Sequence, residues 1–437
     1  MKKQIFLIVF FLIIGLISIG CQNVSNVSKK GKIVIRYWDS MPPVDLVGKV
    51  LHQQLDEYSK EHPEVIIKRE YLQWEHMNER IMTSIVAGDP PDVVLLDRFV
   101  TASYAARNAL TPLDEFIQKS GIKRSDYWDA CWDECIYNGH MWSMPHHTDL
   151  RILYYNVEHF QEGGLDPNKP PRTWQELYEY AKKLTKKDKN GRLIRIGFLP
   201  NVAEGRWLYL WGWANGGVFM KGNKITCNDP KIVEALEWMV KINNLAGRRA
   251  VESAVSSFGE RVNDPFVIGK LSMKIDGDWN LGFLKQYGPN VKFKIAPVPV
   301  PKGHKSVTWS GGFAFVIPRG SKHVKEAWNI IKYLTSYKKQ LEYAKKAYRI
   351  PALKKAAYNK EFLSNKYYKI LVSQMRYSKH RPVTPVAQFY WDELRNAVEV
   401  ALLGEKTPKE ALDEAAKKTQ EYLNEYLKNS NKYGGKK

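Results

Sequence analysis

Strand-like and helix-like segments alternate along the chain, and this alternation constrains its fold more than any other feature. Segment 32–38 (KIVIRYW) alternates apolar and polar residues like a half-buried strand, and 44–60 repeats its apolar residues at helical spacing. Segment 65–72 predicts a second strand, 74–87 a second helix, and 91–97 a short strand buried on both faces. This order predicts a lobe built on a parallel sheet with helical crossovers.

The same pattern recurs downstream. Strand-like runs precede residue 157, and Thr173 and Glu176 form a capping box that opens a helix. Segment 193–198 predicts another strand and 230–246 another helix. A chain of 437 residues is also longer than a single core usually supports, so we expect a second α/β lobe.

The later part of the chain adds strands that end in unusual residues. The strand predicted at 271–275 ends in Asp276-Gly277-Asp278-Trp279. Trp279 is either a core residue behind a turn built by the acids and glycine, or a platform for a ligand. Segment 313–318 predicts a further strand, and the chain after Lys322 reads as almost entirely helical.

The N-terminus predicts export. Lys2 and Lys3 precede an apolar run at residues 5–16, as in a secretion signal, although such a run could also serve as a membrane anchor. The sequence Leu-Ile-Ser-Ile-Gly-Cys at 16–21 resembles a bacterial lipobox, with Ser18 departing from the usual Leu or Val. We therefore expect residues 1–20 to be a lipoprotein signal peptide, Cys21 to be lipidated, and 21–31 to be a flexible tether.

Charge and cysteine usage narrow the function further. The formal net charge is +21, but the basic residues are spread along helices, so we expect attraction to anionic lipid and cell-wall polymer and no nucleic-acid binding. Cys131, Cys135 and Cys227 remain after Cys21, and we expect these three cysteines to be buried and to behave as small apolar residues. His146 and His147 lie beside Asp149, but neighbouring strand residues point to opposite faces, so we expect no metal site and no cofactor.

Several segments together resemble a known family. They occur in the same order and at similar spacings as in the extracellular solute-binding proteins of sugar ABC importers, and the resemblance covers nearly the whole chain after the signal. The segments are AGDPPDVVLLD (87–97), NGHMWSMPHHTDLRILYYN (138–156), GLDPNKPPRTWQEL (164–177), GKLSMKIDGDW (269–279) and WDELRNAVEVALLGEKTPKEAL (391–412).

The resemblance implies a periplasmic-binding-protein-like α/β fold, in which two lobes enclose a ligand cleft and the chain crosses between them at hinges. By similarity, crossings fall near 110–114, near Val262 and near 310–313. The expected N-terminal lobe comprises 32–112 and 263–311, and the C-terminal lobe comprises 113–262 and 312–437.

The resemblance also implies a sugar site. A sugar ring stacks its C–H face on an aromatic ring, and its hydroxyls need polar partners because an unpaired buried hydroxyl is costly. By position in the family, Trp279 is a platform, Trp391 and Arg395 form a helical pair at i, i+4, and a loop contributes Asn201, Glu204 and Trp207. Asp392 stands beside Trp391 where a family member has tyrosine, so the same sugar preference need not apply.

The remaining candidates lie near strand ends or in turns, where α/β folds place ligands. Each has a structural alternative: turn acid, packed aromatic, helix staple, ion pair or plain hinge turn. Glycines in one group could also let backbone amides approach a ligand. The candidates are Trp38, Asp39, Trp74, Asp97, Arg98, Asp149, Asp278, Ser310, Gly311, Gly312 and Arg349.

These features predict a binding protein and no enzyme. A cleft with tryptophans and carboxylates would also suit a glycoside hydrolase, but the chain contains no HExxH, P-loop or, after the signal, GxSxG motif. We expect a carbohydrate ligand, most naturally an oligosaccharide; the alternative is glycerol phosphate or a phosphodiester, which arginines would bind. The resemblance implies ABC permease subunits and a cytoplasmic ATPase as partners, and we expect a monomer anchored outside the cell membrane.

Overall fold

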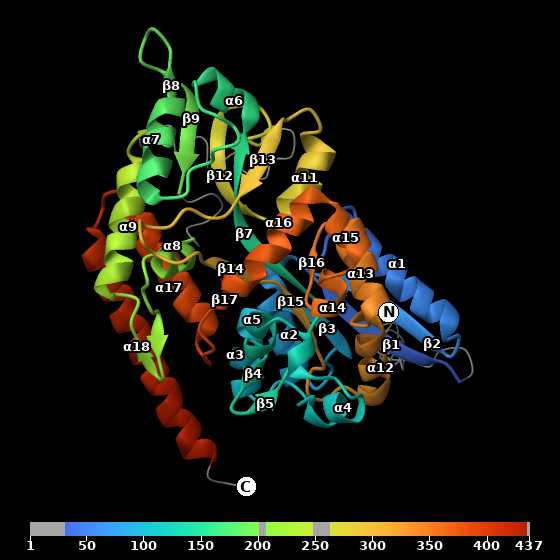
Figure 1. Cartoon of the computed structure of the whole chain (residues 1–437). Coiled ribbons are helices and arrows are strands. Elements are labelled where there is room, and N and C mark those ends of the chain that lie inside the picture. Colours follow the sequence, from blue (N-terminus) through green and yellow to red (C-terminus); the bar gives the residue numbers. More distant parts are fainter. Residues whose placement is uncertain (1–30, 201–206, 248–262, 435–437) are drawn as a thin grey trace, which may run out of the picture.

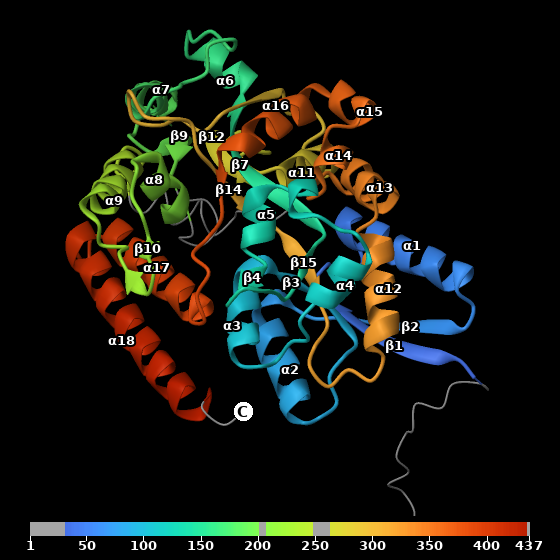
Figure 2. The ribbon, with the colours of Figure 1, turned by 60° about the horizontal axis from the view of Figure 1, so that its bottom comes forward.

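The computed structural model describes residues 31–200, 207–247 and 263–434, with side chains described to residue 429. Its strands form two main sheets, and one long strand, β7, runs from one toward the other (Figure 1). Helices cover both sheets, and the last two helices, α17 and α18, lie side by side along one flank (Figure 2).

The first lobe is built on a five-stranded sheet in the order β2-β1-β3-β15-β6. Strands β1, β2 and β3 are parallel and confirm the predicted α/β lobe, whereas β15 runs antiparallel to β3. The strands are β1 (Ile33–Asp39), β2 (Val65–Tyr71), β3 (Val93–Asp97), β6 (Met144–Pro145) and β15 (Phe313–Val316), and the main helices are α1 (Leu46–Glu61), α2 (Trp74–Val86), α3 (Thr101–Ala106), α4 (Asp114–Lys119), α5 (Asp129–Asp133), α12 (Val324–Leu334) and α13 (Tyr337–Ala347).

The second lobe is built on an eight-stranded sheet centred on β7. The path β17-β14-β7-β12-β9-β8 forms most of it, and β13 and β16 also pair with β7. The strands are β7 (His147–Asn156), β8 (Lys186–Lys187), β9 (Leu193–Leu199), β12 (Leu271–Gly277), β13 (Phe293–Ala296), β14 (Thr308–Gly311), β16 (Ile350–Pro351) and β17 (Ser378–Lys379). The main helices are α6 (Val157–Glu162), α7 (Trp174–Leu184), α8 (Leu208–Ala214), α9 (Pro230–Asn243), α11 (Trp279–Tyr287), α16 (Lys366–Gln374), α17 (Ala387–Leu402) and α18 (Pro408–Gly434).

Shorter elements complete the chain. They are η1 (Arg98–Val100), η2 (Arg124–Asp126), β4 (Ile136–Tyr137), β5 (His140–Met141), β10 (Met220–Lys221), β11 (Lys224–Ile225), α14 (Lys354–Ala357), α15 (Lys360–Ser364) and η4 (Met375–Tyr377).

Local sequence explains how the second lobe begins its helices and packs them. The predicted capping box at the start of α7 is present, with the Thr173 hydroxyl accepting from the Glu176 amide at 3.1 Å. In α9, Pro230 occupies the first turn and the Asp229 side chain caps it. Gly197 lets β9 approach α7, because a Cβ there would lie 1.9 Å from the Ala181 carbonyl oxygen.

The division of the chain between lobes differs from the expectation. Segment 113–145 stays in the first lobe, because the Leu113 amide donates to the Met141 carbonyl and β6 pairs with β15. The first crossing therefore falls at His146, between β6 and β7, and not at 110–114.

Segment 263–311 and the chain after 312 each begin in the lobe opposite to the one expected. Strand β12 pairs with β7 and β9, so 263–311 joins the second sheet, and β15 pairs with β3, so the chain after 312 begins in the first. The crossing predicted near Val262 lies outside the described residues, and β9 and β12, the strands before and after them, share a sheet. Strand β14 lies in the second sheet and β15 in the first, so the chain changes sheet between Gly311 and Phe313. Alternation predicts where strands begin and end, but tertiary contacts choose their partners.

The cysteines and the helices bear on two earlier expectations. Cys131, Cys135 and Cys227 are free and buried, as predicted, whereas Cys21 and the signal lie outside the described residues. Among the described residues, no helix combines the length and the apolar character needed to cross a membrane.

Candidate ligand-binding site

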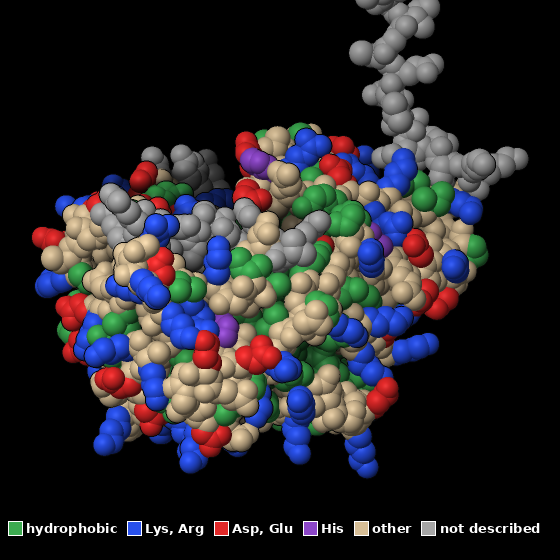
Figure 3. Space-filling model, turned by 90° about the horizontal axis from the view of Figure 1, so that it is seen from above, with side chains coloured by type: hydrophobic (Ala, Val, Ile, Leu, Met, Phe, Trp, Pro, Cys, Tyr) green, Lys and Arg blue, Asp and Glu red, His purple; other side chains and the backbone are tan. Residues whose placement is uncertain are grey.

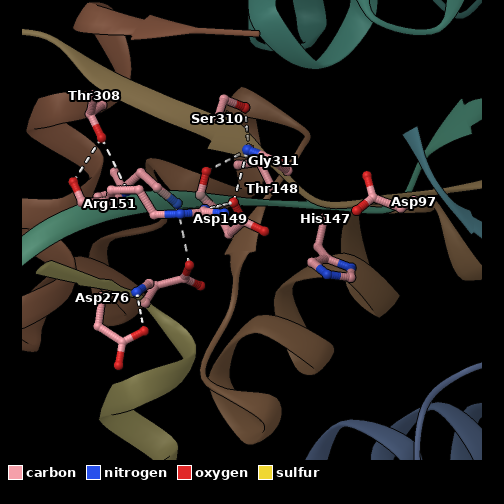
Figure 4. A network of polar contacts seen from close by, with 12 residues as sticks. Asp97, His147, Thr148, Asp149, Arg151, Asp276, Thr308, Ser310 and Gly311 are labelled. Carbon is pink, nitrogen blue, oxygen red and sulfur yellow. Dashed lines mark hydrogen bonds and ion pairs between the residues drawn. The ribbon is translucent and has the colours of Figure 1, made fainter. Parts of the chain in front are cut away.

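A cluster of charged and aromatic side chains lies where β7, β12, β14 and the end of β3 meet between the two sheets. Asp149 and Arg151 stand two residues apart on β7, so the period of the strand puts both on one face. The guanidinium of Arg151 is ion-paired with Asp149, which also accepts from the Gly311 amide at 2.8 Å (Figure 4). Thr308 bonds both backbone groups of Arg151, which holds β14 against β7.

Three tryptophans surround the Arg151 guanidinium. Its central carbon lies 5.0 Å from the ring centroid of Trp207, 4.7 Å from that of Trp279 and 4.0 Å from that of Trp309. These are cation–π distances, and in a desolvated setting each is worth about 1–2 kcal/mol. Nε of Arg151 and Nε1 of Trp309 are buried and have no hydrogen-bond partner among the described residues. The cluster thus combines flat aromatic faces with donors available to a ligand.

Asp278 lies beside this cluster and is fully buried. Its Oδ1 accepts from the Leu150 amide at 3.3 Å, and its Oδ2 has no partner within the described part of the chain. Burial, aided by the nearby charge of Asp149, raises the pKa of Asp278 to about 7, although Arg349 and Arg151 oppose the shift. Burial likewise opposes ionisation of Asp149, but Arg151 and Arg98 outweigh it, so the pKa of Asp149 lies below its ordinary value.

A buried ion-pair network joins the lobes behind the aromatic cluster. Arg381, which follows β17 in the second lobe, donates to Asp97 at 2.7 Å and to Glu134 at 2.9 Å. Glu134 also accepts from Arg98 at 3.2 Å, so the carboxylate is clasped between two guanidinium groups. The Arg381 guanidinium lies over the rings of Phe99, Trp309 and Trp391 at 4.4, 5.5 and 5.5 Å. Burial of these charges is tolerated because each is paired.

Arg98 serves the protein's own backbone. It is fully buried and donates to the His147 carbonyl at 2.8 Å, to Ser310 Oγ at 3.2 Å and to the Gly311 carbonyl, besides Glu134. Its guanidinium therefore has little capacity for a ligand, and its predicted binding role gives way to a structural one. It holds the turn through which the chain crosses between the sheets.

The glycines of that turn have the hinge role that was the structural alternative. Gly312 has φ +119°, and a Cβ there would lie 2.6 Å from the His147 carbonyl and 2.7 Å from Arg98. The Gly311 amide is already bonded to Asp149, and the Ser310 hydroxyl contacts Thr148 at 2.8 Å. These residues shape the cluster from behind, and the amide of Gly311 is not free for a ligand.

Trp279 and Arg349 line an opening toward solvent. Trp279 begins α11 and is half-buried, and the Arg349 guanidinium lies 5.9 Å from its ring centroid. Both border a pocket of ≈ 130 Å³ between α11 and the start of α1, at Asp45 and Leu46. The predicted platform therefore connects the buried cluster to the surface between the lobes.

Trp391 and Arg395 share one side of α17 but have different surroundings. Trp391 is buried against Phe99 at 5.2 Å and Trp309 at 5.6 Å, which places it in the aromatic cluster. Arg395 has 43% of its side chain exposed and pairs with Asp392 at 3.7 Å. Only the tryptophan of the predicted pair reaches the cluster.

The candidates at the end of β1 have mainly structural contacts. Trp38 is buried, with the guanidinium groups of Arg36 and Arg80 within 6 Å of its ring at 5.6 and 5.9 Å. Asp39 accepts from the Met41 amide at 2.7 Å, as a turn acid does. Trp74 is half-buried at the first position of α2. Asn201 and Glu204 lie outside the described residues.

The two histidines correct another expectation. Their Nδ1 atoms lie 3.1 Å apart, so the side chains meet and do not point to opposite faces. His146 falls between β6 and β7, where the chain crosses and the alternation of a strand is interrupted. Burial lowers the pKa of His146 to about 3, which keeps it neutral. The described residues include no group of three or more His, Cys, Asp or Glu able to hold a metal ion.

Four residues of the cluster escaped the sequence analysis. The alternation that put Asp149 in a strand could have included Arg151, and Trp309 directly precedes the Ser-Gly-Gly turn. Glu134 and Arg381 carry no local signal, because 247 positions separate them along the chain. Folding alone brings them together.

Comparison with known proteins places this architecture among binding proteins. Residues 46–341 match the family model described as bacterial extracellular solute-binding protein. The arabinooligosaccharide-binding protein of Bacillus subtilis (strain 168) is 23% identical over 346 residues, which are 76% of each chain. The sn-glycerol-3-phosphate-binding periplasmic protein UgpB of Escherichia coli O1:K1 / APEC is 23% identical over 431 residues, 91% of this chain and 94% of its own. The structure of CpMnBP1 with mannobiose bound has a TM-score of 0.81 and 27% identity, and covers 89% of this chain and 100% of its own.

Proposed function

Because the chain belongs to the bacterial extracellular solute-binding proteins, we propose that it is the substrate-binding component of an ABC importer and captures a carbohydrate, an oligosaccharide, between its lobes. The observation that carries this proposal is the tryptophan-lined cluster around Arg151, with the unpartnered Asp278 Oδ2 beside it. Similarity to an arabinooligosaccharide-binding protein and to a mannobiose-bound structure supports the ligand class.

The side chains of the cluster suit a sugar. Trp279, which is half-buried, offers a flat face for the C–H side of a ring, and Trp309 is buried against Arg151. Asp278, with a pKa of about 7, either donates or accepts a hydrogen bond near neutral pH, which matches hydroxyls that do both. Arg151 supplies a donor at Nε. A sugar entering between α1 and α11 would exchange its hydration for these groups.

Ligand capture would act through the two sheets. Asp97 and Glu134 belong to the first lobe, and Arg381 and Trp391 come from the second, so the site is complete only when the lobes meet. Closure around a ligand would present one composite surface to a permease. We propose a monomer that is lipidated at Cys21 outside the cell membrane and delivers the ligand to permease subunits driven by a cytoplasmic ATPase.

A phosphorylated ligand is the alternative, and the relative that binds sn-glycerol-3-phosphate favours keeping it in the test. Arginine binds phosphate well, but Arg98 and Arg381 are saturated by protein groups, and Arg151 is paired with Asp149. The aromatic faces therefore weigh more heavily than the arginines. We propose binding without turnover, as the membership of the family implies.

The test is a titration of the purified protein with a panel of oligosaccharides and with glycerol phosphate, followed by intrinsic tryptophan fluorescence. Trp207, Trp279 and Trp309 surround the site, so a ligand that stacks there should change the emission. We expect a saturable response to one sugar series and unchanged oligosaccharide on chromatography after incubation. A response to glycerol phosphate alone would establish the alternative, and released monosaccharide would establish a hydrolase.

A further inference from the structure

A second pocket lies in the second lobe and shares no lining residue with the pocket at Trp279. It has a volume of ≈ 360 Å³ and is bordered by α8, the loop that leads into β14, and the segment of η4 and β17. Strand pairing sets Trp309 opposite Lys379, but neither Trp309 nor Arg151 lines the pocket. Its principal side chains are those of Trp213, His304, Lys305, Arg376, Tyr377 and Lys379.

The pocket has charges of one sign. Lys305, Arg376 and Lys379 contribute three cations, and none of the described residues that line the pocket is acidic. Within the described part of the chain, no carboxylate lies within ion-pair distance of these three groups, whereas Arg381, two residues beyond Lys379, is paired with both Asp97 and Glu134. A concave surface with one sign of charge concentrates counter-ions of the opposite sign.

This concentration of like charges differs from the mixed charges on the face seen in Figure 3. Lys and Arg are numerous on the face seen in Figure 3, but acidic side chains are interspersed among them. Lys379 is exposed, but neighbouring protein atoms lower the pKa of its ammonium group by partial burial, and no acid among the described residues pairs with it. An anion in the pocket would supply the missing charge.

Aromatic and imidazole groups add a neutral wall. Trp213 is buried and stacks on Tyr209 at 5.3 Å, so its ring is held in place, and Tyr377 is half-buried on the opposite border. The Arg376 guanidinium lies 4.7 Å from the ring centroid of Tyr377, which orients the cation along this wall. His304 Nδ1 is 3.0 Å from the Ala214 carbonyl and donates to it, which leaves Nε2 for another partner.

We propose that this pocket is a second binding site, for an anionic group, phosphate or carboxylate, carried on a small sugar or similar polyol. Lys305, Arg376 and Lys379 bind the anionic oxygens, since hydrogen bonds between ionised groups are stronger than those between neutral groups. Tyr377 and Trp213 contact the flat side of the polyol. The site is separate from the Arg151 cluster and does not depend on the sugar specificity proposed for it.

Isothermal titration calorimetry with glucose 6-phosphate, glucuronate, inorganic phosphate and glucose tests the proposal. We expect saturable binding of the first two, weaker with added salt, and no response to glucose at this pocket. The triple variant Lys305→Gln/Arg376→Gln/Lys379→Gln should weaken binding of glucose 6-phosphate at least about tenfold, because three charged donors are lost.

The control removes the same charge elsewhere. Lys338, Lys369 and Lys417 are exposed and lie outside the pocket, so Lys338→Gln/Lys369→Gln/Lys417→Gln should leave the affinity within about twofold if only net charge changes. Thermal unfolding of both triple variants checks that they fold. Trp279→Ala, in the interlobe site, should leave binding of glucose 6-phosphate unchanged.

Tyr377→Ala distinguishes a sugar-borne anion from a free one. A loss confined to glucose 6-phosphate, with binding of inorganic phosphate unchanged, supports the polyol wall, whereas unchanged binding of both ligands identifies a free anion as the ligand of the same site. The proposal is overturned if the wild-type protein binds none of the anions saturably, if both triple variants weaken binding equally, or if Trp279→Ala abolishes it.

Discussion

Replacing the buried Arg381 by Met should destabilise the protein far more than the same replacement of the exposed Arg395. The variant keeps an aliphatic chain against Phe99 but removes the hydrogen bonds to Asp97 and Glu134, at 2.7 and 2.9 Å. Both carboxylates belong to the first lobe, and Arg381 itself is only 3% exposed. Removing one partner of a buried ion pair typically costs about 3–5 kcal/mol, because it leaves a charge without compensation.

The structure narrows where that cost arises. Glu134 retains Arg98 at 3.2 Å, so it keeps a cationic partner. Asp97 retains the Phe99 amide at 3.4 Å but loses the guanidinium that pairs with it. Burial already raises the pKa of Asp97 in spite of Arg381, and without the arginine the pKa should rise further. Most of the deficit should therefore come from a charged, unpaired Asp97.

Urea unfolding of the wild type and the variant, at neutral pH and again near pH 4, measures this deficit. A carboxyl whose folded-state pKa lies above its unfolded value stabilises the fold less as the pH rises, so the deficit should shrink when Asp97 is protonated at low pH. Arg395→Met is the control: its pair with Asp392 spans 3.7 Å and is exposed, so it should cost about 0–1 kcal/mol. A deficit below that of the control, or one equal at both pH values, would refute the reasoning.

Three further expectations concern the site and its hinge. Trp279→Ala should weaken the affinity for the sugar by roughly 1–3 kcal/mol in calorimetry and leave the melting midpoint nearly unchanged. The reason is that a half-buried platform contributes more to stacking than to the core. An unchanged affinity would show that Trp279 is a core residue. The folded-state pKa of Asp278 is about 7, which is above the usual value for the unfolded chain. Asp278→Asn should therefore gain stability relative to the wild type as the pH rises through about 4 to 8. A difference in urea midpoints that does not change with pH would contradict the assigned burial. Gly312→Ala should lower the free energy of unfolding by roughly 1–3 kcal/mol or more, because φ is +119° and the new Cβ would lie 2.6 Å from the His147 carbonyl. Gly303→Ala, at φ +84° with open space around it, should lower it less in the same melts. Equal costs would exclude a packed hinge.

Some of the site could be predicted from the sequence because it rests on local patterns. Trp279 follows a strand directly and lies at the start of α11 beside the opening between α1 and α11, and its role as a platform stays a prediction. Trp391, another residue predicted for the site, lies within the aromatic cluster. Arg98 shows the limit, since the sequence puts an arginine at a strand end but does not say whether a ligand or the backbone of a distant turn will meet it.

The alternation of the chain determined the strands, the helices and the α/β class, because backbone pairing and amphipathic burial follow periods of 2 and 3.6 residues that can be read locally. Only the tertiary structure decided that β12 joins β7 and that β15 returns to β3, which exchanged the lobes of the later segments. It alone brought Arg381 to Glu134 and set three tryptophans around Arg151. Strand partners and buried ion pairs depend on the balance of desolvation and pairing across the whole molecule, and no short window of sequence contains that balance.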